Sequence, residues 1–199
     1  MTEKRTNKVI IVCGTKNTGK TTFVRELMLK FPQSKILVVD TIIHPSYEDF
    51  GQPVDSARLA KWKPPKTSTE KSLVRVQMRD LDETLHNISE YVSNTVVIFE
   101  DATKFLRGGL NGIMRNIILD CKQKNDDIIL LFHSLNSVPP ELFENADILI
   151  LKLTQETEQK LRKIDKIPCF DEVLDAYREL QTENTAHGNR YGYKTIYFS

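Results

Sequence analysis

The amino-acid sequence predicts an α/β fold of three layers, in which a mostly parallel central sheet lies between layers of helices. Short apolar runs rich in β-branched residues alternate with longer helical patterns. Continuous apolar strands separated by helices are typical of a parallel sheet that is covered on both faces. After Leu153 the pattern changes to two amphipathic segments and an aromatic tail, which predicts a small helical and β appendage on the core.

The expected strands are apolar runs at 9–13, 35–40, 72–76, 95–100, 127–132 and 147–153. Helices are expected at 20–31, 82–92 and 111–124, with a short turn near 140–144 and amphipathic helices at 155–164 and 171–180. A strand-like run ends the chain. The least regular stretch, 41–71, is expected to be a long surface excursion, and such loops inside compact domains are usually functional or mobile.

Length and composition bound the organisation of the chain. Its 199 residues, 40% hydrophobic and 28% charged, suffice for one substantial domain and are marginal for two. We therefore expect a single domain over 1–199, with the core at about 8–153 and the appendage at 154–199. The net charge of +1 gives no bulk signature of a nucleic-acid or membrane-surface binder, so any contact with a polyanion must come from local patches.

Three widely spaced cysteines, an odd number, indicate reduced thiols rather than disulfides or a metal site. The amino-terminal stretch lacks the apolar length and the cleavage site of a signal peptide. No apolar run approaches the roughly 18 residues of a membrane-spanning helix. We expect a soluble cytoplasmic protein without a membrane segment, in the host cytoplasm if the chain is viral.

A phosphate-binding loop is the strongest functional signal. The segment GTKNTGKT at 14–21 matches G-x-x-x-x-G-K-[ST] and lies between an apolar strand and a helix. Its glycines let successive backbone N–H groups face the phosphates, and the helix N-terminus favours an anion. Lys20 is expected to contact the β- and γ-phosphates of ATP and Thr21 to ligate Mg²⁺. The residues predicted to bind the nucleotide are Gly14, Thr15, Lys16, Asn17, Thr18, Gly19, Lys20, Thr21 and Thr22. For Lys16, a solvated loop position is the alternative.

Adjacent carboxylates end the apolar strand in TVVIFEDATK at 95–104. This is the Walker B form, in which one acid holds Mg²⁺ through its water shell and a second acid can polarise the attacking water. The usual order, Asp then Glu, is reversed here. By position Glu100 serves the metal and Asp101 the water, although the roles stay open to sharing or exchange. Simple solubilisation of a strand end is the alternative.

Two other strand ends carry polar residues. Asp40 ends KILVVD, and His133 follows DIILLF. In open parallel sheets the ligand lies outside the carboxyl ends of the strands. A polar residue on a strand between the phosphate-loop strand and the acidic strand would point at the γ-phosphate, and His133 is the candidate for this role. A capping role for Asp40, and a core or loop-cap role for His133, are the alternatives.

With these motifs in place, the chain resembles the FtsK–HerA superfamily of DNA-pumping P-loop ATPases, which includes viral genome-packaging ATPases. The resemblance rests on GTKNTGKT, VVDTIIHP, VVIFEDATKFL and LLFHSLNSVPPELFENADILIL, and spans about 8–153. It implies an ASCE or RecA-like fold and a catalytic set of Lys20, Glu100, Asp101 and His133, with His133 detecting γ-phosphate loss. It also implies a motor of a phage or mobile element that translocates or packages double-stranded DNA as a homo-oligomeric ring, usually a hexamer.

Several details stay open. In such rings an arginine from a neighbouring subunit completes each site. The candidates are Arg107, Arg115, Arg162 and Arg190, and for each of them an ordinary surface position is the favoured alternative. DNA contacts are expected at 61–66 (KWKPPK) and 105–112 (FLRGGLNG), although both also fit solvated loops.

Other classes of protein are also considered. The reversed acids keep a non-hydrolysing nucleotide switch or assembly scaffold open. LRKIDK at 161–166 could be the lid of a small-molecule or nucleoside kinase. A GTPase is disfavoured because no NKxD-type base-reading motif is present.

Overall fold

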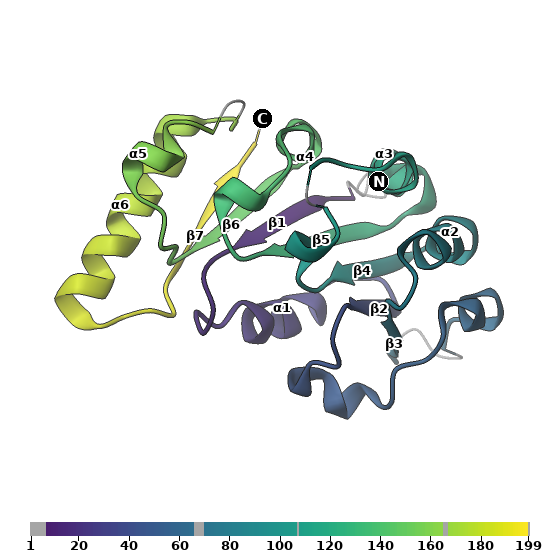
Figure 1. Ribbon diagram of the computed structural model, residues 1–199. Helices are drawn as coiled ribbons and strands as arrows, with labels where there is room; N and C mark the ends of the chain where they lie inside the picture. The colour runs from purple at the N-terminus through teal and green to yellow at the C-terminus, as the bar shows by residue number, and fades with distance from the viewer. Residues whose placement is uncertain (1–6, 66–69, 107, 165–166, 199) are drawn as a thin grey trace, which may run out of the picture.

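A computed structural model describes residues 7–65, 70–106, 108–164 and 167–198. Over these residues the centre is a seven-stranded sheet in the order β3-β2-β4-β5-β1-β6-β7. Strands β1 to β6 are parallel, and β7 pairs with β6 in the antiparallel sense (Figure 1). The expected α/β fold, with its mostly parallel sheet and its small carboxyl-terminal helix-and-strand appendage, is confirmed.

The first six strands lie within one residue of the bounds expected from the sequence, and the seventh falls in the strand-like run expected at the end of the chain. They are β1 (Val9–Cys13), β2 (Lys35–Asp40), β3 (Ser72–Gln77), β4 (Thr95–Phe99), β5 (Asp127–Phe132), β6 (Ile148–Lys152) and β7 (Tyr193–Tyr197). The α-helices are α1 (Lys20–Met28), α2 (Leu81–Tyr91), α3 (Gly112–Lys124), α4 (Pro140–Asn145), α5 (Glu158–Leu161) and α6 (Phe170–His187). Short 3₁₀ helices are η1 (Pro45–Phe50), η2 (Ser56–Lys61), η3 (Ala102–Lys104) and η4 (Leu135–Ser137).

The appendage departs most from the expected helices. The helix expected at 155–164 is confined to α5, because the preceding carbonyls bond elsewhere: Gln181 Nε2 donates to the Thr154 carbonyl at 2.7 Å, and Tyr177 Oη donates to the Glu156 carbonyl at 2.7 Å. The helix expected at 171–180 is longer than predicted and continues as α6 to His187. It ends where Gly188 takes a left-handed conformation, with φ of 64°. The helix expected at 20–31 is shorter than predicted and ends at Met28.

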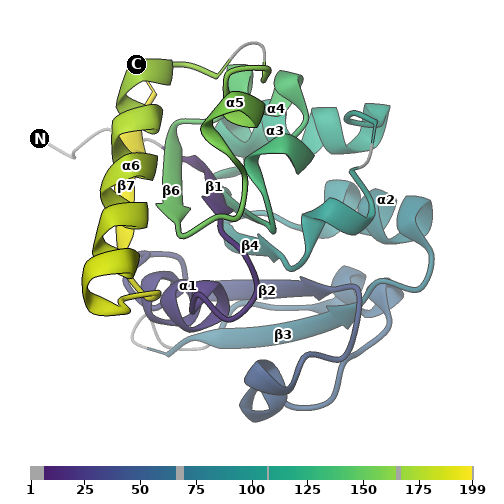
Figure 2. The same ribbon diagram turned by 60° about the vertical axis from the view of Figure 1, so that its left-hand side comes forward.

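The two faces of the sheet are buried by different helices. Alternate strand residues pack with Val24 and Met28 of α1 on one face. The other set packs with apolar residues of α2, α3, α4 and α6 on the opposite face. Figure 1 shows α1 on one side of the sheet with α2, α3 and α4 on the other, and Figure 2 shows α6 lying along β7. Because the strands are covered on both sides, their continuous apolar sequences are explained.

The described residues of 41–71 are more regular and more buried than the sequence predicted. It contains η1 and η2, and Val54 forms an isolated parallel bridge with Val76 of β3. Tyr47 and Leu59 are 0% and 1% exposed, respectively, so the expectation of a simple surface excursion is wrong for these residues. Their apolar side chains fold the excursion back onto both faces of the sheet. In the described part of the chain, no helix has the length and apolar character needed to cross a membrane.

Candidate nucleotide-binding site

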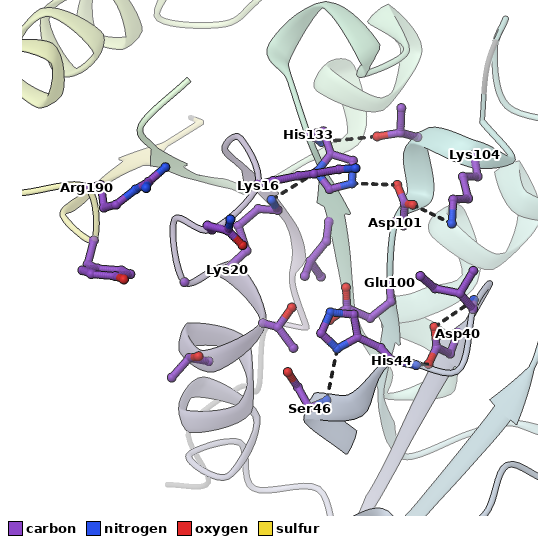
Figure 3. A pocket seen from close by; sticks show the side chains of 18 residues that line it. Lys16, Lys20, Asp40, His44, Ser46, Glu100, Asp101, Lys104, His133 and Arg190 are labelled. Atoms are coloured by element: carbon purple, nitrogen blue, oxygen red, sulfur yellow. Dashed lines mark hydrogen bonds and ion pairs between the residues drawn. The ribbon is translucent and has the colours of Figure 1, made fainter. Parts of the chain in front are cut away.

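A cleft of about 830 Å³ lies at the carboxyl ends of β1, β2, β4 and β5 (Figure 3). Four separate segments line it: the phosphate loop with the start of α1, the chain after β2, the end of β4 with η3, and the end of β5. A fifth contribution comes from the turn before β7 through Arg190 and Tyr191. The location fits the general position of ligands in open α/β sheets.

The phosphate loop is held between the ends of the two strands that flank β1, which are β5 and β6. The Gly14 N–H donates to the Phe132 carbonyl at the end of β5 (3.2 Å), and the Thr15 N–H donates to the Leu153 carbonyl after β6 (2.9 Å). A Cβ atom on Gly14 would lie 2.8 Å from Cβ of Lys152, so glycine is required there by close packing. Gly19 then turns into α1 with φ of 74°. The loop is therefore fixed at both ends, with the N-terminus of α1 directed at the cleft.

Lys20 lies at the bottom of the cleft. Its Nζ donates to the carbonyls of Gly14 (2.6 Å) and Thr15 (3.0 Å), and lies 3.3 Å from Nδ1 of His133. The residue is only 9% exposed. Burial lowers the pKa of Lys20, and nearby acidic groups oppose that effect. The chain thus places one buried cation beside the helix N-terminus, where a phosphate would lie.

Glu100 immediately follows β4 and is 6% exposed. Its Oε1 accepts a 2.5 Å hydrogen bond from Oη of the fully buried Tyr47. Burial raises the pKa of Glu100, and hydrogen bonds from Tyr47 and Thr21 act in the opposite direction. The contact with Thr21 brings together the two side chains predicted to serve Mg²⁺. Tyr47, from η1, is a part of the site that the sequence did not reveal.

Asp101 occupies a left-handed backbone conformation, with φ of 51° and ψ of 49°. Its Oδ2 lies 3.0 Å from Nζ of Lys104, and its Oδ1 lies 3.2 Å from Nε2 of His133. Burial would raise the pKa of Asp101, but the hydrogen bonds from His133 and Lys104 lower it to about 2. The pKa of Asp101 is therefore shifted in the opposite direction from that of Glu100, because His133 and Lys104 stabilise the carboxylate form of Asp101.

His133 connects the phosphate loop to the acidic strand (Figure 3). Because the Lys20 ammonium can only donate, its contact with Nδ1 of His133 favours the tautomer that carries the ring proton on Nε2, the nitrogen 3.2 Å from Oδ1 of Asp101. The His133 backbone N–H donates to Oγ1 of Thr103 in η3 at 3.3 Å. The ring is therefore positioned from both ends and is not part of the apolar core. Thr103 is a second contributor without a sequence signal.

Asp40 also borders the cleft, yet its carboxylate is used by the fold. Its Oδ2 accepts from Arg75 Nη2 at 2.5 Å and from the His44 N–H at 2.8 Å, while Oδ1 accepts from the Ile42 N–H. Both side chains of the ion pair with Arg75 are 1% exposed. The sequence left two roles open for Asp40, and this geometry favours capping and ion pairing over a contact with the ligand.

The remaining predicted loop residues divide by exposure. Lys16, Asn17 and Thr22 are exposed and line the cleft, whereas Thr18 is buried and donates to the Thr15 carbonyl at 2.9 Å. Thr18 thus shapes the loop rather than facing the ligand.

The arginine candidates have different surroundings. Arg115 pairs with Glu141 and Arg162 with Glu158, both within this chain, whereas Arg190 borders the cleft of its own chain. Arg107 lies outside the described residues. Among described residues of 161–166, none lines the cleft, so the lid expected for a kinase is not supported.

The two candidate DNA-binding loops are partly built into the fold. Trp62 donates from Nε1 to Oγ of Ser72 at 2.8 Å, and Lys35 Nζ lies 4.6 Å from its ring centroid. Its neighbours Lys61 and Lys63 are exposed, and Lys66, the third lysine of the expected contact, lies outside the described residues. Lys35 and Ser72 are the first residues of β2 and β3. This loop therefore lies at the amino-terminal ends of the strands, whereas the cleft lies at their carboxyl ends. In 105–112, Leu106 and Leu110 are buried and fix the described ends of the glycine-rich turn.

The fold and the phosphate loop are those of a P-loop NTPase, and comparison with known proteins supports this class. No protein-family model and no curated protein sequence matches the chain. Its fold is similar to that of the genome packaging NTPase B204 from Sulfolobus turreted icosahedral virus 2 in complex with sulfate. The TM-score is 0.72 and the sequence identity 14%, over 98% of this chain and 93% of that chain. The same protein in complex with ATP-gammaS gives 0.71 and 15%, over 97% and 93% of the two chains.

B204, the DNA-packaging ATPase from Sulfolobus Turreted Icosahedral Virus, is also similar. Its TM-score is 0.64 at 15% identity, over 96% of this chain and 98% of that chain. At these identities the likeness establishes a shared fold. The resemblance to packaging ATPases expected from the motifs is thus confirmed in the fold, across nearly the whole chain.

Replacing Asp101 by Asn tests the electrostatic setting of this carboxylate. Asparagine tolerates the left-handed conformation but cannot carry the charge. A folded-state pKa of about 2, below the ordinary 3.8, stabilises the fold at pH values above 3.8, and this contribution is lost as the pH falls toward 2. We expect Asp101→Asn to lower the free energy of unfolding by about 1–2 kcal/mol at pH 7 and by progressively less below pH 4.

Urea unfolding followed by circular dichroism at pH 7, 5, 4 and 3 measures this effect. The variant Glu90→Gln removes one exposed negative charge on α2 and serves as the control. If Asp101→Asn has the same free energy of unfolding as the wild type at pH 7, or if the difference is not smaller at pH 3, the lowered pKa of Asp101 would be contradicted.

Proposed function

We propose that the chain is a Mg²⁺-dependent ATPase that acts as a ring-forming motor on double-stranded DNA, of the genome-packaging type, in the cytoplasm. The observation that carries the proposal is the position of β5 between β1 and β4, which brings His133 between Lys20 and Asp101. A side chain in that position can contact both the γ-phosphate and the group that orients the attacking water. Such a connection is needed when hydrolysis is coupled to movement.

The loop from Gly14 to Thr22 supplies backbone N–H groups and the helix N-terminus for the triphosphate, with Lys20 as the cation. Thr21 and Glu100 offer hydroxyl and carboxylate oxygens, which suit Mg²⁺. The described residues contain no cluster of three or more potential His, Cys, Asp or Glu ligands. This fits a magnesium ion that takes most of its ligands from phosphate and water. When bound, Mg²⁺ neutralises charge on the reacting phosphates.

The two acids are assigned by their surroundings. Glu100 contacts Thr21 and is fixed by Tyr47, which supports its role at the metal. Asp101 contacts His133, which supports its role toward water. With a pKa of about 2, Asp101 is a weak proton acceptor, so we assign it to orienting the water and polarising it rather than to full proton abstraction. The reversed order of the acids is compatible with hydrolysis on this assignment.

The DNA-motor part of the proposal has two supports. The first is the likeness in fold to B204, described as a DNA-packaging ATPase. The second is the exposed pair Lys61 and Lys63, which lies at the end of the sheet away from the cleft and could follow a phosphate backbone. A ring of such chains, usually a hexamer, would gather several lysine loops around one duplex, so a chain of low net charge can still bind DNA.

The rate of ATP hydrolysis, measured with and without linear double-stranded DNA, tests the proposal. We expect DNA to raise the rate and Lys20→Ala to reduce it by at least about 100-fold, because the buried cation whose ammonium bonds to the phosphate-loop carbonyls is removed. Lys122→Ala, which removes an exposed lysine of α3 outside the cleft lining, is the matched control and should retain most of the activity. Nucleotide binding without turnover would instead indicate a switch, and stimulation by a nucleoside but not by DNA would indicate a kinase.

Tyr47→Phe tests the role of Glu100. The change keeps the buried ring but removes the hydroxyl that donates to the carboxylate, so the pKa of Glu100 rises further. If ionised Glu100 holds the metal, the acidic limb of the Mg²⁺-dependent hydrolysis rate moves to higher pH in the variant, and the rate recovers at alkaline pH. Tyr177→Phe, which also removes a tyrosine hydroxyl bonded within the chain, is the control. An unchanged acidic limb would argue against this role.

A further inference from the structure

The cleft continues past the phosphate loop to a turn that no sequence motif marks. This turn, residues 188–192, connects α6 to β7 and contributes Arg190 and Tyr191 to the lining. Figure 3 shows Arg190 on the opposite side of Lys16 and Lys20 from Asp101 and Glu100. The carboxyl-terminal appendage therefore closes the end of the cleft that is farthest from the acids.

The orientation of a nucleotide follows from this arrangement. Its terminal phosphate must lie near Lys20 and the acids, where the cation and the predicted magnesium ligands are. The other phosphates follow the loop backbone toward the N-terminus of α1. The sugar and base must then leave the loop at the far end, and there the cleft is bordered by Thr22, Arg190 and Tyr191.

Tyr191 lies directly against the phosphate loop. Its Cδ1 is 3.3 Å from the place where a Cβ on Gly19 would stand, so the absence of a side chain at Gly19 makes room for the ring. The residue nevertheless remains 65% exposed, which leaves aromatic surface open at the cleft. An exposed aromatic ring of this kind offers a flat face for a nucleotide base.

The turn that carries Tyr191 is held firmly. Lys152, which is 3% exposed, donates from Nζ to the Tyr191 carbonyl at 2.9 Å. The same Nζ lies 5.4 Å from the ring centroid of Phe23 and 5.3 Å from that of Tyr193, so it is fixed between α1 and β7. The Tyr191 N–H donates to Oδ1 of Asn189 at 3.2 Å. The backbone that presents the ring is therefore tied to the elements that carry the phosphate loop.

We propose that Tyr191 is the platform on which the base of the bound nucleoside triphosphate stacks. Arg190 of the same chain lies beside the platform and contacts the same nucleotide. The proposal rests on the proposed function, because it takes the ligand to be a nucleoside triphosphate. Stacking uses the π-face that every base has, and so discriminates weakly among bases. The subsite accordingly accepts purine nucleoside triphosphates in general, with ATP and GTP bound to similar extents.

Isothermal titration calorimetry with ATP and with inorganic tripolyphosphate, which has no base, tests the platform. The proteins are the wild type, Tyr191→Ala and Tyr191→Phe, each in the presence of Mg²⁺. Tyr197→Ala, which removes another exposed tyrosine of the β7 region outside the cleft lining, is the matched control. Circular dichroism confirms that each variant is folded, and Tyr191→Phe retains the ring if the alanine variant is not.

We expect Tyr191→Ala to weaken ATP binding by about 10-fold or more and to leave tripolyphosphate binding within about twofold, since base–aromatic stacking is worth 1–3 kcal/mol. Tyr191→Phe and Tyr197→Ala should bind both ligands as the wild type does. An equal effect of Tyr191→Ala on ATP and tripolyphosphate, or no effect on either, would overturn the platform, while binding of both ligands by the wild type would still support the phosphate site. A wild-type protein that binds neither ligand would instead overturn the proposed function and the platform with it.

Discussion

The pairing of β5 with both β1 and β4 is the constraint on which the candidate site depends. In this register Cys13 lies opposite Phe132, and Phe99 lies opposite Leu130. The phosphate loop, His133 and the two acids therefore leave the sheet at one edge. The same pairing extends into the loop through the Gly14 N–H and the Phe132 carbonyl. A slip of one residue in β5 would turn His133 to the other face and separate Lys20 from Asp101.

Around this framework the charges are set by individual partners rather than by the overall composition. Lys20 is buried against carbonyl groups, Glu100 is fixed by Tyr47, and Asp101 is held ionised by His133 and Lys104. A chain with a net charge of +1 can in this way offer a strong anion site next to a carboxylate pair. Because these groups are largely buried, their interactions are screened less by salt than those of surface charges. A local site for a triphosphate thus needs no basic surface.

Most of the fold, and the part of the site formed by contiguous motifs, could be predicted from the sequence. The strands are short uninterrupted apolar runs. Glu100 and His133 directly follow two of them, and Lys20 begins the helix after a third, so their common position at the carboxyl ends of the strands could be predicted. The role of Tyr47 in the site could not be predicted, because its partner Glu100 is 53 residues away and only the folding of η1 onto the sheet brings them together. Tyr191 likewise reaches the loop only because β7 joins the sheet beside β6. The early helix in the appendage was overestimated because tertiary hydrogen bonds outweighed its local amphipathic pattern.

The placement of His133 between the phosphate loop and Asp101 is tested most directly by nitrogen NMR of protein with ¹⁵N-labelled histidine. The chain has four histidines, and a His133→Gln variant assigns the signal. We expect an Nδ1 resonance that moves when a non-hydrolysable ATP analogue and Mg²⁺ are added, but moves much less with ADP and Mg²⁺. A response that is the same for the two nucleotides, or that is absent for both, would contradict the position of His133 at the γ-phosphate.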